Sequence, residues 1–408
     1  MAENETEINE TKEILESVQL DLENKEDQSN EIEIKKEAKP IKEDRKKTKE
    51  LYAEFSSFLE TKADITEDIG IKETIPTGID LIDAILGGGF GIGALSIIVG
   101  QPGSGKSMLA IQTLAQGEKQ FAETKTDPGL MGFFLDSEEA TTAIRLRNLG
   151  VKRPKIYTDV TVEKVFKLVE GLSVFTKEKK LTNPSIVVWD SIANTLSQKE
   201  RETDDPNTVI GYKARLLSIL VPKYVAKCAQ NRICLLAVNQ LRDVIALGQF
   251  APPKDLKLMS HTKDMPGGNV LKFNAFQLLE MKVKSVIAPG SQTYDSEKYG
   301  FEGVIVKMKC VKNKLFQPNV EIEVVGSFVN GFSNFWTNFN FLKAHKRLAA
   351  GAWNYLISLP DKKFRTKDAP SLYKEDVVFK EAFDKAAKET IEIEIINKYN
   401  IEIDEDDD

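Results

Sequence analysis

The sequence predicts an α/β fold with a mostly parallel central sheet, and two patterns carry this prediction. First, the apolar run 95–99 leads into a glycine-rich loop, and the loop leads into residues 108–114, whose apolar positions recur at helical spacing. Second, nearly continuous apolar runs alternate with helical segments, which is typical of parallel strands covered on both faces. These runs span 132–136, 185–190 and 233–240.

Three later runs alternate apolar and polar residues, or nearly so, and predict antiparallel strands that extend this sheet. They span 276–283, 303–311 and 320–325. A smaller mixed α+β region is expected from about residue 331 onward, and it carries two of the three tryptophans of the chain, Trp336 and Trp353.

The loop at 100–107 reads GQPGSGKS and matches the pattern G-x-x-x-x-G-K-[ST]. Its glycines let backbone N–H groups converge on an anion, and the N-terminus of the following helix adds partial positive charge. Lys106 would reach the β- and γ-phosphates, and the Ser107 hydroxyl would hold a magnesium ion. We therefore predict a nucleoside triphosphate site formed by Gly100, Gln101, Pro102, Gly103, Ser104, Gly105, Lys106 and Ser107.

Polar side chains end the strands on either side of this loop, at the edge where ligands of parallel sheets collect. Asp190 is expected to orient the magnesium ion through a water molecule. Glu138 could take a proton from the water that attacks the γ-phosphate, and its neighbour Glu139 is an alternative that the spacing does not exclude. Gln240 can form a hydrogen bond with a γ-phosphate and so report its loss.

Composition limits the remaining classes of function. The chain has 408 residues and a net charge of −7, so any contact with nucleic acid must come from a local basic surface. Three cysteines without a C-x-x-C pair and only two histidines argue against a zinc site or a disulfide framework, and favour a reducing cytoplasm. No apolar run approaches the roughly 18 residues of a membrane span, and the polar N-terminus is no secretory signal.

The chain is expected to divide into five segments. Residues 1–48 are a charged leader without aromatic side chains, predicted to be disordered, and 401–408 are an acidic tail. Between them we expect a helix and linker at 49–70, an ATPase core at 71–330 and a small domain at 331–400. In the helix, an apolar face that includes Phe55 and Phe58 would pack on its own domain or on a neighbouring subunit.

Seven segments occur in the order seen in RecA recombinases, and the chain resembles this family over about residues 71–325. The segments are Glu73–Gly78, Gly100–Ser107, Asp136–Glu138, Trp189–Ser191, Val238–Arg242, Gly267–Phe273 and Val311–Lys314. The part after residue 331, including 363–368, resembles the T4-type phage recombinases of the UvsX kind more than the bacterial members.

The resemblance implies a RecA-like core whose ATP and Mg²⁺ support a helical filament on single-stranded DNA, which pairs that strand with homologous double-stranded DNA. Hydrolysis of ATP would depend on DNA, with Glu138 as the base and Gln240 as the γ-phosphate sensor. Lys312 and Lys314, which share one face of a strand, would reach the ATP of the neighbouring subunit. Lys272, Phe273, Phe55 and Phe58 would lie at the same subunit interface.

The family places two DNA-binding loops after the second and third of the apolar runs, here at about 200–211 and 241–266. The first is acidic, with Arg201 and Lys213 nearby. The second would hold phosphates through cations while apolar side chains separate bases. The resemblance implies that DNA is bound by Arg242, Lys254, Lys257, Lys263, Gly267, Gly268 and Asn269. Arg145 stands near the position where bacterial members stack a tyrosine on the adenine, and a guanidinium can also stack on a base.

Two other functions remain open from the sequence. A ring-forming replicative helicase shares this core, and a recombination regulator could bind ATP and DNA without exchanging strands. The prediction of a recombinase also implies single-strand-binding and loading proteins as partners, no membrane, and a location in the cytoplasm of a prokaryote or of a phage-infected host.

Overall fold

The computed structural model describes residues 73–125, 127–203, 205, 209–243, 263–349, 351 and 353–399. The chain divides into two units, Met1–Ile69 and Gly70–Asp408, and all described residues lie in the second. Phe55, Phe58, Lys254 and Lys257 lie outside the described residues, as do the leader 1–48 and the tail 401–408. The segment boundaries expected from the sequence therefore stay predictions.

A sheet of nine strands is the centre of the described part of the chain, in the order β13-β12-β11-β10-β3-β7-β6-β4-β5. Neighbouring strands are parallel from β10 to β5 and antiparallel from β10 to β13. This confirms the predicted fold class. The strands are β3 (Leu95–Gly100), β4 (Met131–Asp136), β5 (Ile156–Tyr157), β6 (Ser185–Asp190), β7 (Ile233–Gln240), β10 (Gln277–Ile287), β11 (Gly303–Asn313), β12 (Glu321–Ser327) and β13 (Gly331–Phe332).

One strand differs from the prediction. The run 276–283, expected to be antiparallel, forms β10, which pairs parallel with β3 and antiparallel with β11. The physical reason is the connection that precedes it. The chain leaves the carboxyl end of β7, passes through α9 (Asn269–Asn274) and returns to the edge of the sheet where β3 begins, beside which β10 starts; such a crossover produces parallel pairing.

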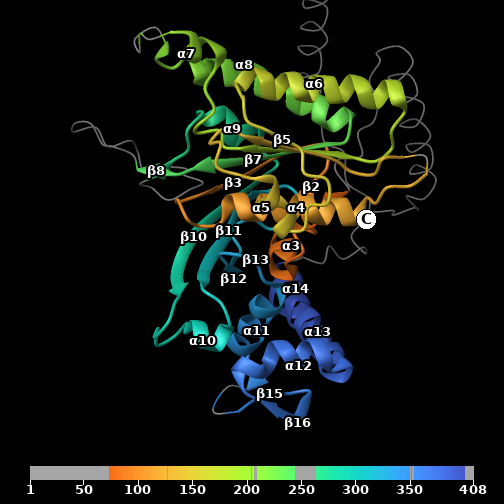
Figure 1. Cartoon of the computed structure of the whole chain (residues 1–408), viewed down its shortest axis with the longest axis vertical. Helices are drawn as coiled ribbons and strands as arrows, with labels where there is room; N and C mark the ends of the chain where they lie inside the picture. Colours follow the sequence, from red (N-terminus) through yellow and green to blue (C-terminus); the bar gives the residue numbers. More distant parts are fainter. Residues whose placement is uncertain are drawn as a thin grey trace, which may run out of the picture. The chain divides into compact units, whose positions relative to one another are not determined.

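Helices cover both faces of the sheet (Figure 1). Ile97 and Val99 of β3 pack in one apolar cluster with α6 (Val162–Lys179) and α8 (Tyr212–Gln230). Ile98 packs in the other cluster, with α4 (Lys106–Gln120) and α3 (Asp80–Leu86). The alternation along β3 is that of a buried strand with helices on both sides, so the loop that follows it is held on a rigid base.

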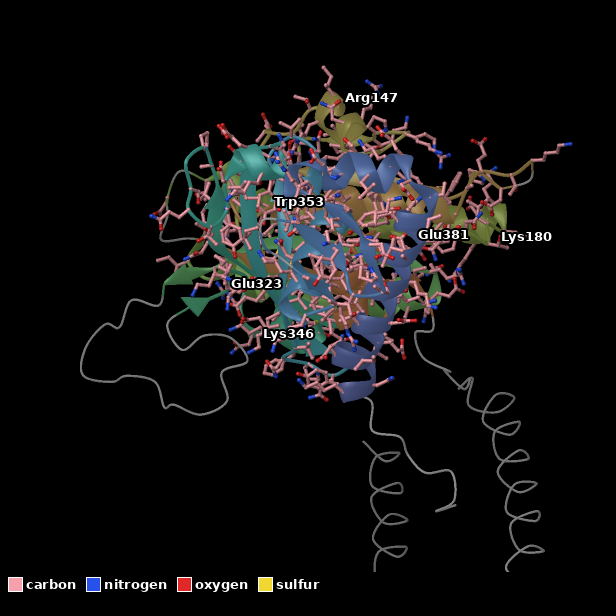
Figure 2. The ribbon with its side chains drawn as sticks, turned by 90° about the horizontal axis from the view of Figure 1, so that it is seen from below. Arg147, Lys180, Glu323, Lys346, Trp353 and Glu381 are labelled. Carbon is pink, nitrogen blue, oxygen red and sulfur yellow. The ribbon has the colours of Figure 1, made fainter. Side chains whose placement is uncertain are left out.

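The C-terminal region is a small α+β assembly, as predicted. A third apolar cluster joins its helices to a three-stranded sheet. Trp353 lies on the outside of this region, where its ring is 5.3 Å from the guanidinium carbon of Arg365 (Figure 2). The elements are α11 (Asn334–Ala344), β14 (Leu348–Ala349), β15 (Asn354–Leu356), β16 (Leu359–Phe364), α12 (Ala369–Glu375) and α13 (Val377–Ile391), followed by a π-helical turn (Glu392–Ile396).

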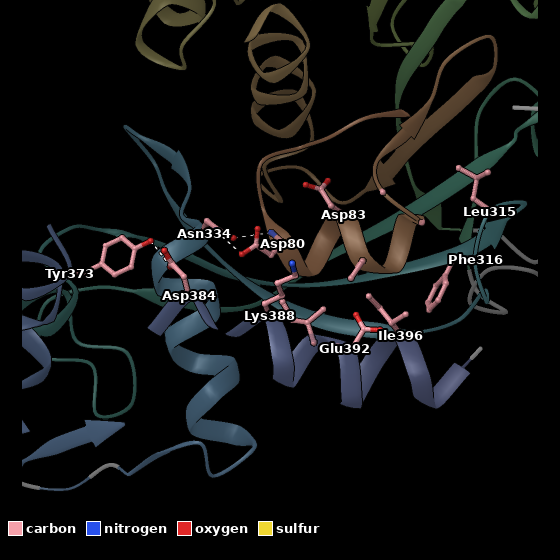
Figure 3. Close-up of a pocket in the computed structure, with 14 residues that line it drawn as sticks. Asp80, Asp83, Leu315, Phe316, Asn334, Tyr373, Asp384, Lys388, Glu392 and Ile396 are labelled. Atoms are coloured by element: carbon pink, nitrogen blue, oxygen red, sulfur yellow. Dashed lines mark hydrogen bonds between the residues drawn. The ribbon is translucent and has the colours of Figure 1, made fainter. Parts of the chain in front are cut away.

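A cavity of about 840 Å³ lies between α3 and the C-terminal helices, and Figure 3 shows the side chains that line it. Asp80 at the start of α3 accepts hydrogen bonds from the side-chain amides of Asn334 and Asn338 on α11. These bonds attach the C-terminal region to the core. Among the described residues, no helix is both long and apolar enough to cross a membrane.

Candidate nucleotide site

The glycine-rich loop joins β3 to α4, because Gly100 is the last residue of β3 and Lys106 the first of α4. Gly103 and Gly105 have φ angles of +74° and +85°, which residues with a Cβ atom rarely adopt. A Cβ atom on Gly105 would also lie 2.8 Å from the ring of Phe332. Backbone with such angles can turn successive N–H groups toward one point, as an anion requires.

Lys106 and Ser107 follow at the N-terminus of α4. The Lys106 ammonium is largely buried and donates a hydrogen bond to the backbone oxygen of Gln101 at 2.8 Å. Burial lowers the pKa of Lys106, and the nearby carboxylates of Asp190 and Glu138 oppose that change. The ammonium therefore lies between the loop and two acidic groups. Because it is already largely removed from water, binding a phosphate there would cost little further desolvation.

Asp190 ends β6 and is 5% exposed. The pKa of Asp190 is raised to about 6, and burial is the main cause. The charges of Glu138 and Asp136 also raise this pKa, whereas the hydrogen bond from Ser107 lowers it. A hydroxyl and a carboxylate in hydrogen-bond contact are oxygen ligands of the kind that Mg²⁺ prefers. Ser107 and Asp190 therefore fit the predicted magnesium site.

Glu138 lies on a tight turn after β4. The buried carboxylate of Asp136 fixes this turn by accepting hydrogen bonds from the backbone N–H groups of Glu138 and Thr141, at 3.1 and 2.7 Å. Glu138 Oε1 accepts hydrogen bonds from Ser191 Oγ at 3.0 Å and Asn194 Nδ2 at 2.6 Å. Among the described residues, Glu138 lines the cleft above the loop and Glu139 does not.

This cleft has a volume of about 590 Å³ and collects most of the predicted nucleotide-site residues. Arg145 lies at one side, where its Nη1 donates to the backbone oxygen of Val329 at 2.8 Å. Phe328, which is 50% exposed, lines the same cleft and was not predicted from the sequence. The lining residues that were predicted are Pro102, Gly103, Gly105, Lys106, Ser107, Glu138, Arg145, Asp190 and Gln240.

Gln240 links the cleft to the second predicted DNA loop. It ends β7, and its backbone N–H donates to Asn239 Oδ1 at 3.0 Å. The Asn239 Nδ2 atom donates a hydrogen bond to the backbone oxygen of Pro266 at 2.8 Å. One fully buried side chain thus joins the two ends of segment 241–266 beside the cleft.

The residues predicted at the base of that loop are described in part. Arg242 lies on β8 (Arg242–Asp243) and Lys263 on β9 (Lys263–Asp264), and these short strands pair antiparallel. Gly267 and Gly268 have φ angles of +103° and +80° and lead into α9, whose first residue is Asn269. The backbone therefore holds the two sides of the loop together where it leaves the core.

The four described residues predicted at the subunit interface lie together, away from the cleft. Lys312 Nζ donates to the backbone oxygens of Lys272 and Phe273 at 2.9 and 2.7 Å. Burial, followed by the charge of Lys314, lowers the pKa of Lys312. Phe273 is 71% exposed, and Lys314 Nζ lies 6.0 Å from the ring centre of Phe276.

The first predicted DNA loop, at about 200–211, begins inside α7 (Gln198–Glu202), which Ser197 and Glu200 start as a reciprocal capping box. The two cations expected near this loop make internal contacts. Arg201 pairs with Asp159, and Lys213 donates to the backbone oxygens of Ile192 and Ala193. These two cations therefore do not neutralise the negative charge of the acidic side chains in the loop.

The fold and the cleft define a protein of the phosphate-loop class, with a mixed sheet extended on one side by antiparallel strands. The family model of the RecA N-terminal domain matches residues 58–333, so this chain belongs to the RecA family.

Curated relatives agree with this assignment. The chain is 30% identical over 265 residues to Protein RecA of Borrelia duttonii (strain Ly), covering 64% of each chain. It is 27% identical over 251 residues to Protein RecA of Heliobacterium modesticaldum, covering 61% of this chain and 63% of the relative. The chain thus spans just under two thirds of the length of these relatives. The crystal structure of the RadB recombinase matches with a TM-score of 0.41 and 17% identity over 64% of this chain and 98% of that one, too weakly for any inference.

Proposed function

We propose that this protein is an ATP-dependent DNA recombinase, which assembles as a filament on single-stranded DNA and pairs that strand with homologous double-stranded DNA. The observation that carries the proposal is the cleft itself. It brings Lys106, Ser107, Asp190, Glu138 and Gln240 from separate strand ends to one site beside the glycine-rich loop. Membership of the RecA family supports the same conclusion.

The cleft residues suggest how ATP would be hydrolysed. Lys106 and the loop N–H groups would bind the β- and γ-phosphates, and Mg²⁺ held by Ser107 and Asp190 would neutralise their charge. Glu138 would accept a proton from a water molecule as the water oxygen attacks the γ-phosphorus. The bond from that phosphorus to the β–γ bridging oxygen breaks, which yields ADP and phosphate. Arg145 and Phe328 would bind the base at the side of the cleft.

The link to DNA would run through Gln240. A γ-phosphate that binds the side-chain amide of Gln240 would shift the position of the Gln240 backbone. Asn239 connects that backbone to Pro266, at the far end of segment 241–266. Lys312 and Lys314 would contact the triphosphate of the neighbouring subunit, so ATP binding would favour the filament. From the resemblance after residue 331, we further propose that the chain is of the T4 phage type and acts in a prokaryotic or phage-infected cytoplasm.

A displacement-loop assay tests the proposed function. The protein is incubated with a labelled single strand, a homologous supercoiled duplex, ATP and Mg²⁺. We expect joint molecules with the homologous duplex and none with a heterologous one. ATP hydrolysis on single-stranded DNA without joint molecules would instead favour a regulator, and unwinding by closed rings would favour a helicase.

A further inference from the structure

The candidate base Glu138 and the candidate metal ligand Asp190 come from neighbouring strands that end side by side. β4 and β6 are parallel, and their last residues, Asp136 and Asp190, are paired in register. Beyond these residues both strands turn, so contacts between the two turns set the position of Glu138 relative to Asp190. Both carboxylates line the same cleft, and like charges repel at short range. The contacts between the turns therefore act against this repulsion.

One residue of the first turn, Ser137, makes several of these contacts. Its backbone N–H donates to the backbone oxygen of Asp190 at 2.8 Å, which extends the ladder between the two strands by one hydrogen bond. Its hydroxyl oxygen accepts a hydrogen bond from the Ser191 N–H at 2.9 Å. The hydroxyl can also donate to the backbone oxygen of Asp190 at 3.2 Å or of Ser191 at 3.0 Å. A single hydroxyl thus serves as donor and acceptor to the backbone at the end of β6.

A second hydrogen bond closes this link from the side of the base. Ser191 Oγ donates to Glu138 Oε1 at 3.0 Å. Because Ser137 directly precedes Glu138 and Ser191 directly follows Asp190, the two turns and these hydrogen bonds form a closed ring. A movement of one turn relative to the other would break at least one bond of the ring.

The surroundings of the ring leave the Ser137 hydroxyl without a substitute. Ser191 is 1% exposed, so water would not readily replace a lost partner of its N–H. An unpaired buried N–H group is costly, and the backbone at Ser191 would move to find another acceptor. That movement would displace the Asp190 carboxylate on one side and the Ser191 hydroxyl, which holds Glu138, on the other.

We propose that Ser137 is a positioning residue whose hydroxyl fixes the separation between the base Glu138 and the carboxylate of Asp190. Ser137 does not itself line the cleft among the described residues, so it would act through its neighbours. The proposal rests on the proposed function in one respect, because it assumes that the cleft hydrolyses ATP. Loss of the hydroxyl should slow the chemical step and leave the binding of nucleotide to Lys106 and the glycine-rich loop intact.

Steady-state ATP hydrolysis by the full-length protein on single-stranded DNA tests this proposal, together with the affinity for a fluorescent ATP analogue and unfolding in urea. The variants are Ser137→Ala, Ser137→Thr and Ser137→Val. Threonine keeps the hydroxyl and valine does not, so the comparison of these two isolates the hydroxyl from the added bulk. Thr390→Val is the matched control, because Thr390 on α13 is 2% exposed and its hydroxyl also donates to a backbone oxygen, that of Ala386.

We expect Ser137→Ala and Ser137→Val to lower kcat about 10- to 100-fold, because a small misplacement of the base is enough to slow proton transfer. The KM for ATP and the affinity for the analogue should stay at the parent values. Ser137→Thr should recover most of the lost kcat. Thr390→Val should unfold at lower urea concentration and keep the parent kcat, which separates a loss of stability from a loss of turnover.

A double variant shows whether Ser137 acts through the base. Glu138→Gln already lacks the proton acceptor, so the position of its side chain no longer matters for proton transfer. Adding Ser137→Ala to Glu138→Gln should therefore lower the residual kcat no further.

Three results would overturn the proposal. Parent-like kcat in Ser137→Ala, or equal kcat in Ser137→Thr and Ser137→Val, would remove the role of the hydroxyl. A raised KM with unchanged kcat would assign Ser137 to nucleotide binding instead. A full further loss in the double variant would show that Ser137 does not act through Glu138. Hydrolysis without joint molecules in the displacement-loop assay would refute the recombinase alone, whereas a parent protein without hydrolysis would refute both.

Discussion

The Lys312 ammonium donates a hydrogen bond to the backbone oxygen of Phe273 at 2.7 Å, which ties the end of β11 to the last turn of α9. The side chain of Phe273 is 71% exposed, and Lys314, which follows the last residue of β11, lies 6.0 Å from the ring centre of Phe276. Within the described part of the chain, neither Lys312 nor Lys314 lines the cleft that holds Lys106. The proposed contact of these lysines is therefore with a triphosphate in the cleft of a neighbouring copy.

The first prediction follows from this separation. Lys312→Ala and Lys314→Ala should each lower ATP hydrolysis on single-stranded DNA by at least tenfold, because each removes a cation from the shared site. Nucleotide binding by dilute protein without DNA should not change, since the cleft of one copy is intact. Lys298→Ala is the control, because Lys298 is an exposed lysine of the short helix α10 (Ser296–Tyr299) between β10 and β11. Parent-like hydrolysis in both variants would show that the lysines do not act in trans.

The second prediction separates two adjacent carboxylates. Glu138→Gln should lower kcat about 10²–10⁴-fold and leave ATP binding intact, because an amide of the same shape cannot accept the proton. Glu139→Gln should keep the parent rate, since Glu139 does not line the cleft among the described residues. Measured turnover and nucleotide affinity of both variants decide between them. Inactive Glu139→Gln beside active Glu138→Gln would reverse the assignment.

The third prediction concerns the link between Gln240 and segment 241–266. Asn239→Ala should make the affinity for single-stranded DNA insensitive to ATP, because it removes the bond between the two ends of that segment. Asn274→Ala is a matched control, since its amide also donates to a backbone oxygen, that of Val270, but within α9. DNA binding by fluorescence anisotropy, with and without ATP, gives the comparison. If ATP still changes the affinity of the Asn239→Ala protein for single-stranded DNA, this link is ruled out.

The fourth prediction is a pH dependence of stability. Burial raises the pKa of Asp83 from its ordinary 3.8 to about 7, although hydrogen bonds from Thr77 and Gly78 oppose the change. Between these values the unfolded chain releases the proton while the folded protein keeps it. The contribution of Asp83 to the free energy of unfolding is therefore largest below pH 4, and falls by about 1.4 kcal/mol per pH unit as pH rises toward 7.

Asp83→Asn should remove this contribution. Urea unfolding of the parent and the variant at pH 5, 6 and 7 measures the difference between them. We expect the parent to lose stability relative to the variant as the pH rises over this range. Parallel curves for the two proteins would contradict a raised pKa for this carboxyl.

Much of the cleft could be predicted from the sequence, because the rules that place it are local. The glycine-rich loop fixes Lys106 and Ser107, and the carboxyl ends of parallel strands bring Asp190, Glu138 and Gln240 to the same edge. The spacing did not separate Glu138 from Glu139. That distinction depends on the turn held by Asp136, which no periodic pattern encodes.

The remaining features depend on tertiary contacts. The alternation of residues 276–283 predicts a strand but carries no information on its direction, which the crossover through α9 sets. The sequence does not predict that Lys213 holds the turn that carries Asn194, because Lys213 donates to a backbone oxygen of that turn, and a backbone oxygen is present at every position. Phe328 enters the cleft from the turn after β12, and an isolated aromatic residue in a turn gives no signal of its own.

The most direct test of the whole account measures the affinity for a labelled single strand with and without a non-hydrolysable ATP analogue, alongside electron micrographs of the same samples. The account predicts that the analogue tightens binding at least tenfold and produces helical filaments, and that Lys106→Ala abolishes both effects. Equal affinity with and without the analogue, and no lengthwise assembly in either sample, would contradict it.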